Sequence, residues 1–246
     1  GFSQITLSQT TVNNDVANIC GAGVTFSNAS LTGDPGAIAN FTGGISGGLG
    51  STMNSGVVLG TGYLNSAGAL GGSGFKSENT SGGSISQLTA IAGSSTYNGI
   101  ILEFDFIPNT NKISFDYMFL SEQYLRQGDP GTCGYTDAFA FLIKKTTDTN
   151  YKNLALVPNT NIPITSETVR GPGGRCQESN SQYFGHYNTN GSPTSFNGQT
   201  AILTAETDVI PGTKYHIKLV IADQGNGLYD SGVILKAGSF VGSKDL

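Results

Sequence analysis

Apolar and acidic side chains alternate along the segment IILEFDFIP at residues 100–108. Leu102, Phe104 and Phe106 point to one face of an extended chain, and the two acids between them point to the other. The segment YHIKLVIA at residues 215–222 repeats this period of two. Such alternation is typical of β-strands with one buried face, so both segments are predicted to be strands of a sheet.

Further short segments with strand-like composition are separated by turn residues, and they lie at residues 24–26, 56–59, 113–120, 138–143, 154–157, 201–204 and 232–236. Many short strands with few helices predict an all-β fold, either a β-sandwich or a jelly-roll-like fold. One or two short peripheral helices are expected, at residues 12–19 after a Thr10 or Thr11 cap and within residues 84–92. The Gly/Ser-rich residues 33–50 and 66–83 are predicted to be long ordered loops.

A length of 246 residues fits one large β-sandwich or two small domains. We expect a single β domain over residues 4–240. Residues 1–3 resemble the remnant of a signal peptide, with the mature chain starting at Gln4. Residues 241–246 have the polar composition of a linker to a C-terminal sorting segment or of an expression scar.

The composition predicts an exported protein with a well-packed core. Glycine contributes 36 residues and charged residues only 12%, while 13 Phe and 10 Tyr supply apolar volume. The net charge of -5, with no run of Lys or Arg, predicts that nucleic acid is not a partner. No apolar segment approaches the ~20 residues of a membrane-spanning helix, so no membrane insertion is expected.

The three cysteines lack the close spacing of a zinc or redox site. Cys133 and Cys176 each lie in a Gly-rich segment that could bring them together, and we predict a disulfide between them. Closing that loop would stabilise the fold by roughly 4 kcal/mol. Cys20 lies at helical spacing from Val16 and is interpreted as a small buried apolar residue.

Four acids lie at the ends of predicted strands: Glu122, Asp137, Asp223 and Asp230. If these strand ends share one rim of a sandwich, their carboxylates and nearby carbonyls could supply the six to eight oxygens that calcium prefers. Calcium is therefore the predicted cofactor. The alternative is that each acid caps a turn, as Asp often does beside Gly and Ser.

Aromatic and amide residues collect in the segment SQYFGHYN at residues 181–188. Tyr183, Tyr187 and Asn188 have flat, polar-edged side chains that suit sugar or peptide contacts, so they are the predicted ligand-binding residues. The alternative is that the tyrosines only anchor a long loop.

Catalytic patterns are weak, and we expect no enzyme activity. GISGG at residues 44–48 matches the nucleophile-elbow pattern, but it is not expected to follow a strand and lies in a segment where chance matches are common. Glu122 and Asp137 could form a glycosidase pair on a polysaccharide. The chain has no Trp to line a sugar groove, and this argues against the hydrolase alternative.

Six segments occur in one order along the chain: IILEFDFIP at 100–108, FLSEQY at 119–124, YTDAFAF at 135–141, NLALVP at 153–158, YHIKL at 215–219 and YDSGV at 229–233. This set resembles the choice-of-anchor L domain, a family of secreted bacterial surface proteins. The chain departs from the family where Gln123 and Asn226 replace acids, which puts these two residues in doubt as metal ligands. The four acids named above match.

The resemblance implies a secreted, bacterial cell-surface adhesion or recognition module that binds an extracellular glycan or peptide. The opening residues are similar to exported proteins that use type IX secretion, including a cargo associated with gliding motility. If a sorting domain follows, the secretion machinery is an implied partner. A passive cargo or spacer domain without a ligand is the remaining alternative.

Overall fold

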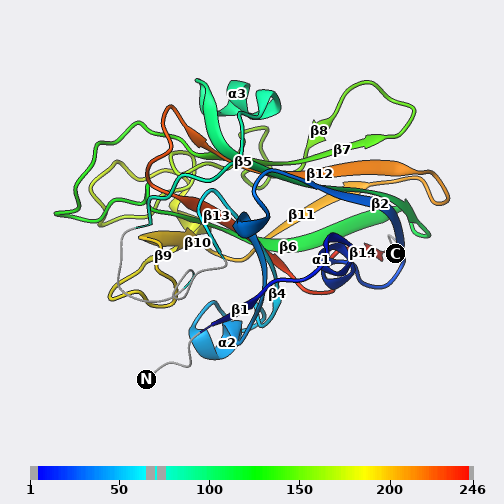
Figure 1. Cartoon of the computed structure of the whole chain (residues 1–246), viewed down its shortest axis with the longest axis horizontal. Coiled ribbons are helices and arrows are strands. Elements are labelled where there is room, and N and C mark those ends of the chain that lie inside the picture. The colour runs from blue at the N-terminus through cyan, green and yellow to red at the C-terminus, as the bar shows by residue number, and fades with distance from the viewer. Residues whose placement is uncertain (1–4, 65–69, 71–75, 244–246) are drawn as a thin grey trace.

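The computed structural model describes residues 5–64, 70 and 76–243. Within these residues two antiparallel sheets pack face to face, as the all-β prediction requires (Figure 1). The smaller sheet has the order β2-β5-β12-β7-β8, and its strands are β2 (Val24–Thr32), β5 (Thr96–Pro108), β7 (Ala138–Lys145), β8 (Lys152–Asn153) and β12 (Tyr215–Gln224). The alternating segments at 100–108 and 215–222 pair with each other at its centre, with Phe104 opposite Ile217.

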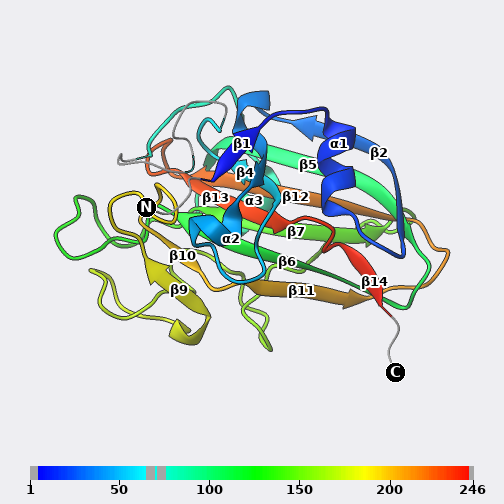
Figure 2. The same ribbon diagram turned by 90° about the horizontal axis from the view of Figure 1, so that it is seen from below.

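The larger sheet has the order β1-β3-β4-β13-β6-β10-β9, and β11 and β14 also pair with β6 (Figure 2). Its strands are β1 (Thr6–Ser8), β3 (Ile38–Thr42), β4 (Gly56–Gly60), β6 (Lys112–Ser121), β9 (Phe184–Tyr187), β10 (Gly198–Thr200), β11 (Leu203–Asp208), β13 (Ser231–Lys236) and β14 (Val241–Ser243). Strand β6 is the longest member of this sheet and organises it, because four of the other strands pair with it.

The main core fills the space between the two sheets and is rich in aromatic rings. Phe119 of β6 stacks on Phe139 of β7 with ring centroids 4.9 Å apart, so the two sheets touch directly. Phe240, just before β14, packs edge-on against Phe106 of β5 at 4.9 Å. Aromatic pairs of this kind add stabilisation beyond the apolar area that they bury.

Three short helices lie at the periphery of the described residues: α1 (Val12–Ile19), α2 (Gly44–Gly47) and α3 (Ser86–Ala92). Helix α1 begins after Thr11, whose hydroxyl accepts a hydrogen bond from the Asn14 amide, as the capping pattern predicted. Helix α3 lies over the outer face of the smaller sheet, where Leu88 packs against Ala140 and Val220 (Figure 1). The central strands are therefore buried on both faces in this region.

Several boundaries differ from the sequence predictions. Residues 154–157 form no strand, and the short β8 lies just before them. The predicted strand at 201–204 begins at Leu203 and runs on to Asp208. The predicted loop at 33–50 contains β3, α2 and a 3-10 turn at Pro35–Ala37, and another 3-10 turn lies at Ser181–Tyr183. Val241–Ser243 pair with β6, so the fold extends past the expected limit at residue 240. Residues 1–3 and most of 66–75 lie outside the described residues.

A buried carboxylate cluster at one end of the sandwich

Strand register brings the four predicted acids to the same end of the molecule. In the larger sheet, Ser121 at the end of β6 pairs with Ser231 at the start of β13, which places Glu122 beside Asp230. The Glu122 amide donates to the Asp230 carbonyl at 3.0 Å. In the smaller sheet, Ala222 of β12 pairs with Ala138 of β7, which places Asp223 beside Asp137. Antiparallel pairing thus joins one strand end and one strand start in each sheet.

A hydroxyl pair joins these two halves across the sandwich. Ser231 Oγ of the larger sheet donates to Asp137 Oδ2 at 2.6 Å. Ser231 Oγ also lies 2.7 Å from Ser121 Oγ. All four carboxylates are buried, with exposed fractions of 0 or 1%. We call Glu122, Asp137, Asp223 and Asp230 the carboxylate cluster.

Backbone amides and one carboxamide hold the cluster from several segments. The Lys76 amide donates to Glu122 Oε1 at 2.8 Å, and the Glu78 amide donates to both Asp230 oxygens at 2.9 and 3.1 Å. Asn98 Nδ2 donates to Asp223 Oδ2 at 2.8 Å. The Gln224 amide donates to Asp137 Oδ1 at 3.0 Å.

Two oxygens of the cluster have no hydrogen-bond partner among the described residues. Glu122 Oε2 and Asp223 Oδ1 are buried and accept no hydrogen bond from any of the residues that the structure describes. A buried carboxylate oxygen without a donor costs about 1–3 kcal/mol, and more when the group is charged. The folded chain therefore presents two buried acceptors that a proton or a cation would satisfy.

Burial raises the pKa of every member of the cluster. The pKa of Glu122 rises to about 8, and those of Asp137 and Asp230 rise to about 7. Burial, followed by the charge of Asp137, raises the pKa of Asp223 well above its usual value. Asp230 also raises the pKa values of the other three members, so the four groups repel one another when ionised.

The side chains do not converge on one point in this conformation. Within residues 5–64, 70 and 76–243, no group of three or more His, Cys, Asp or Glu is arranged to hold a metal ion. The structure therefore brings the predicted calcium ligands to one end of the sandwich, but it does not close them around a common centre.

Comparison with family models gives a match to the choice-of-anchor L domain over residues 4–241. The chain belongs to the choice-of-anchor L domain family. This membership identifies a secreted, surface-associated protein. Comparison with curated proteins and with solved structures gave no match. No helix in the described part of this choice-of-anchor L domain is long and apolar enough to cross a membrane.

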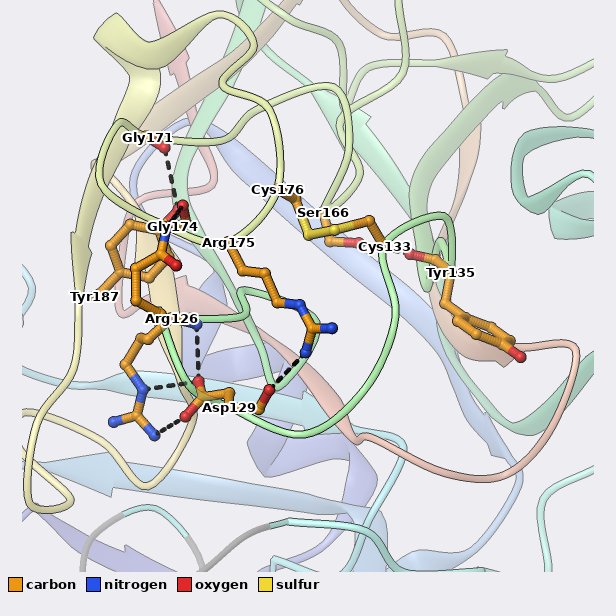
Figure 3. The surroundings of a disulfide bond; sticks show 11 residues. Arg126, Asp129, Cys133, Tyr135, Ser166, Gly171, Gly174, Arg175, Cys176 and Tyr187 are labelled. Atoms are coloured by element: carbon orange, nitrogen blue, oxygen red, sulfur yellow. Dashed lines mark hydrogen bonds and ion pairs between the residues drawn. A yellow bond between two sulfur atoms is a disulfide. The ribbon is translucent and has the colours of Figure 1, made fainter.

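The predicted disulfide between Cys133 and Cys176 is confirmed (Figure 3). It joins the β6–β7 loop to the Gly-rich segment around Cys176, and an ion pair and a hydrogen bond also hold the same loop. Arg126 Nε donates to Asp129 Oδ2 at 2.9 Å, and the Arg175 guanidinium donates to the Asp129 carbonyl at 2.7 Å. The loop beside the carboxylate cluster is therefore cross-linked in this choice-of-anchor L domain.

The predicted ligand-binding residues make internal contacts. Asn188 is buried, and its Nδ2 donates to Thr194 Oγ1 at 3.0 Å and to the Phe196 carbonyl at 2.8 Å. The Tyr187 hydroxyl donates to the Gly171 carbonyl (Figure 3), and Tyr183 packs against the main core. These contacts support the alternative in which both tyrosines anchor the loop.

The other residues considered for a functional role, in the GISGG segment and at His216 and Cys20, make contacts within the fold. The GISGG segment does follow a strand, β3, against the expectation, but the Ser46 hydroxyl donates to the Gly43 carbonyl at 3.1 Å. His216 of β12 lies between two carboxylates of the neighbouring strand β5. Its Nδ1 is 2.6 Å from Asp105 Oδ1, and its Nε2 is 2.9 Å from Glu103 Oε1. Cys20 is partly buried, packs against the main core, and burial raises its thiol pKa to about 12, as its apolar interpretation requires.

The sequence did not point to the residues that hold the cluster. Lys76, Glu78 and Asn98 bond three of the four carboxylates, although they lie far from them along the chain. No local motif marks residues 76–78, because their role depends on backbone amides that any residue other than proline would supply.

Proposed function

We propose that this choice-of-anchor L domain is an extracellular recognition module whose ligand-binding end is stabilised by calcium. The metal would be held by Glu122, Asp137, Asp223 and Asp230, and the ligand would be an extracellular glycan or peptide. Family membership supports the cell-surface location. The carboxylate cluster supports the metal.

The observation that carries the calcium proposal is a pair of buried oxygens, Glu122 Oε2 and Asp223 Oδ1, which accept no hydrogen bond within the described part of the chain. Four buried acids repel one another when ionised, and a divalent cation reverses that repulsion. Because the oxygens do not converge without the ion, calcium binding requires side-chain rotation within the cluster. Calcium tolerates such flexible, irregular oxygen cages.

The donor set favours calcium over other metals. The cluster offers carboxylate oxygens together with the hydroxyl of Ser231, and neither described histidine is bonded to it. Hard oxygen donors suit calcium and magnesium, whereas zinc and copper prefer nitrogen and sulfur. Magnesium demands stricter octahedral geometry and keeps more of its water, so a buried, loop-held cluster suits calcium better.

Thermal unfolding of the whole chain with calcium, with magnesium and with chelator tests this proposal. Near pH 8, calcium at a hundredfold excess over its Kd should raise the Tm by roughly 5–10 °C, because an ion that binds only the folded state stabilises it. Magnesium should raise it less. Equal melting temperatures of the wild type with calcium and with chelator would remove the metal from the proposal.

Glu122→Gln makes the test specific to the cluster. With chelator, this variant should melt above the wild type near pH 8, because the amide carries no buried charge. With calcium it should gain less than the wild type, because a ligand is lost. Asp148→Asn is the matched control, since it removes one exposed acid in the turn after β7, at the other end of that strand from the cluster.

Burial favours binding over the hydrolase alternative. Glu122 and Asp137 have exposed fractions of 0%, so a glycosidic oxygen cannot reach either carboxyl group in this conformation. If the wild type hydrolysed a member of a polysaccharide panel and Glu122→Gln did not, the hydrolase alternative would be favoured instead. A glycan and peptide array without reproducible binding would instead favour a passive spacer domain.

Export by the type IX route remains a prediction and belongs to this proposal. Its test is surface labelling of the native protein in cells with and without that route. Unchanged surface exposure in cells lacking the route would contradict it.

A further inference from the structure

We propose that a pocket beside the carboxylate cluster binds a single neutral sugar unit of a surface glycan. The pocket has a volume of about 210 Å³ and is lined by Gln123, Thr132, Tyr135, Asn226, Leu228 and Tyr229, together with Gly131. This inference rests on the proposed function, because it names the ligand class and the residues of a recognition module. It moves the ligand site away from the 181–188 segment.

The walls of the pocket combine apolar surface with uncharged polar groups. Tyr135 and Leu228 are 40% and 46% exposed, so they offer apolar surface to solvent. Gln123, Asn226 and Thr132 supply amides and a hydroxyl, and no lining residue carries a charge. Sugar rings present C–H faces that pack on aromatic rings and hydroxyls that bond to amides.

Gln123 is the polar group that marks the pocket as a binding site. Its side chain is only 5% exposed and lines the pocket. Its backbone amide donates to Ser121 Oγ at 2.9 Å, but its carboxamide makes no hydrogen bond to the residues that the structure describes. A carboxamide in a pocket wall without partners among the described residues favours a ligand that supplies both a donor and an acceptor, as a sugar hydroxyl does.

The pocket walls are held in place before any ligand binds. Thr132 and Tyr135 flank Cys133, whose disulfide fixes their loop, and the Tyr135 ring points away from the disulfide in Figure 3. Tyr229 has φ of +68°, an unfavourable value for a bulky residue. Strain of this kind persists where surrounding contacts impose it, often at ligand sites. Preorganised walls lower the entropic cost of binding.

The pocket and the carboxylate cluster are adjacent along the chain. Gln123 follows Glu122, and Tyr229 precedes Asp230, so two of the four acids are directly bonded to residues that form walls of the pocket. An ion that orders the cluster would also order these two walls. We therefore expect sugar binding to be tighter with calcium than with chelator.

The pocket suits a sugar better than a peptide. Its lining residues all lie in loops, so no strand edge is present there to pair with an extended chain. The absence of charge among these residues gives a peptide terminus no partner. A volume below the usual range of about 300–1,000 Å³ for drug-sized ligands fits one ring.

Ligand-observed saturation-transfer NMR with methyl glycosides of neutral hexoses, deoxyhexoses and N-acetylhexosamines tests the proposal on the whole chain. At least one glycoside should give a signal with the wild type. Tyr135→Ala and Gln123→Ala should each weaken binding about tenfold, the size expected for one lost ring or hydrogen-bond contact. Ile210→Ala, which removes an equally exposed apolar side chain from another loop, should bind as the wild type does.

The outcomes test the pocket, the sugar ligand and the proposed metal separately. Sugar binding that is unchanged in Tyr135→Ala and Gln123→Ala would overturn the pocket and leave the recognition function standing. If no glycoside gives a signal, the proposal of a sugar ligand is overturned. It is also overturned if short peptides bind more tightly and displace the sugar. Calcium-dependent melting of the same wild-type sample reports separately on the proposed metal. Far-UV circular dichroism shows whether each variant is folded.

Discussion

At the scale of single residues, the unusual feature of this domain is the concentration of buried negative charge. Four carboxyl groups with almost no exposure share a few backbone donors, and two of their oxygens have none among the described residues. Their raised pKa values mean that, without a cation, the folded state retains protons at neutral pH that the unfolded state releases. Stability therefore depends on pH through this cluster.

The chelated protein should lose stability as the pH rises from about 3.8, the ordinary pKa of Asp, to about 8, the raised pKa of Glu122. Below this window both states are protonated, and within it the folded state binds more protons, so the free energy of unfolding falls. Each unit of pKa shift corresponds to about 1.4 kcal/mol, so the total loss should reach several kcal/mol. Urea unfolding across this range measures it. Glu122→Gln should flatten the curve, and a flat wild-type curve would contradict the cluster's role.

Gly62 is a single position on which the cluster depends. A Cβ at this residue would overlap the Asp230 carboxylate. We expect Gly62→Ala to destabilise the fold by about 1–3 kcal/mol, as overpacking commonly does, and to reduce the calcium response. Gly83→Ala is the matched control, because a Cβ there meets no atom within 4 Å. Equal unfolding midpoints for the two variants would show that Asp230 can move freely.

At the scale of elements, the β6–β7 loop carries most of the proposed function. It starts with Glu122 and ends with Asp137, it supplies four pocket residues, and the disulfide joins it to a segment 43 residues away. The strands on either side, β6 and β7, each pair with neighbours on both sides in their sheets. We expect the disulfide to hold the exposed part of the loop in place.

Cys133→Ser with Cys176→Ser should lower the free energy of unfolding by about 4 kcal/mol, the entropic value for a loop of this length. It should also weaken calcium and sugar binding, because the pocket wall is released. Chemical unfolding and ligand titration of the double variant measure both effects. Cys20→Ser, which leaves the disulfide intact, is the control. Undiminished ligand binding in the double variant would show that the ion pair and hydrogen bonds of Arg126 and Arg175 are enough to order the loop.

At the scale of the whole molecule, the segment around Phe240 closes the sandwich. Phe240 is 1% exposed and packs against Phe104 and Phe106 of one sheet and Phe115 of the other. Its amide donates to the Ile19 carbonyl, which ties helix α1 to the same point. The chain segment after β13 is thus part of the core.

Phe240→Ala should destabilise the fold by about 3–5 kcal/mol, because it leaves a cavity between the sheets. Ile210→Ala, at an exposed position, should change the stability by less than about 0.5 kcal/mol. Equilibrium unfolding in urea compares them. A loss for Phe240→Ala no larger than that for the control would show that the end of the chain is dispensable for the core.

Much of the fold was predictable because its signals are local. The period of two at residues 100–108 and 215–222 identifies β5 and β12, and the Thr11 cap identifies α1. The short strands β1, β9, β10 and β14 were missed, because three or four residues carry no measurable period. The same limit explains the false strand at 154–157, where apolar residues fill a loop against the main core.

The sequence by itself determined the all-β class, the disulfide partners and the identity of the four acids, because composition, spacing and residue type are properties of the chain. Only the tertiary structure decided that these acids meet. The pairing of Ser121 with Ser231 and of Ala222 with Ala138 depends on contacts between distant segments. The burial that raises the pKa of Glu122 arises only when the two sheets pack, and so does the lack of a partner for its Oε2 among the residues that the structure describes. Desolvation is a property of the folded state, and no local pattern encodes it.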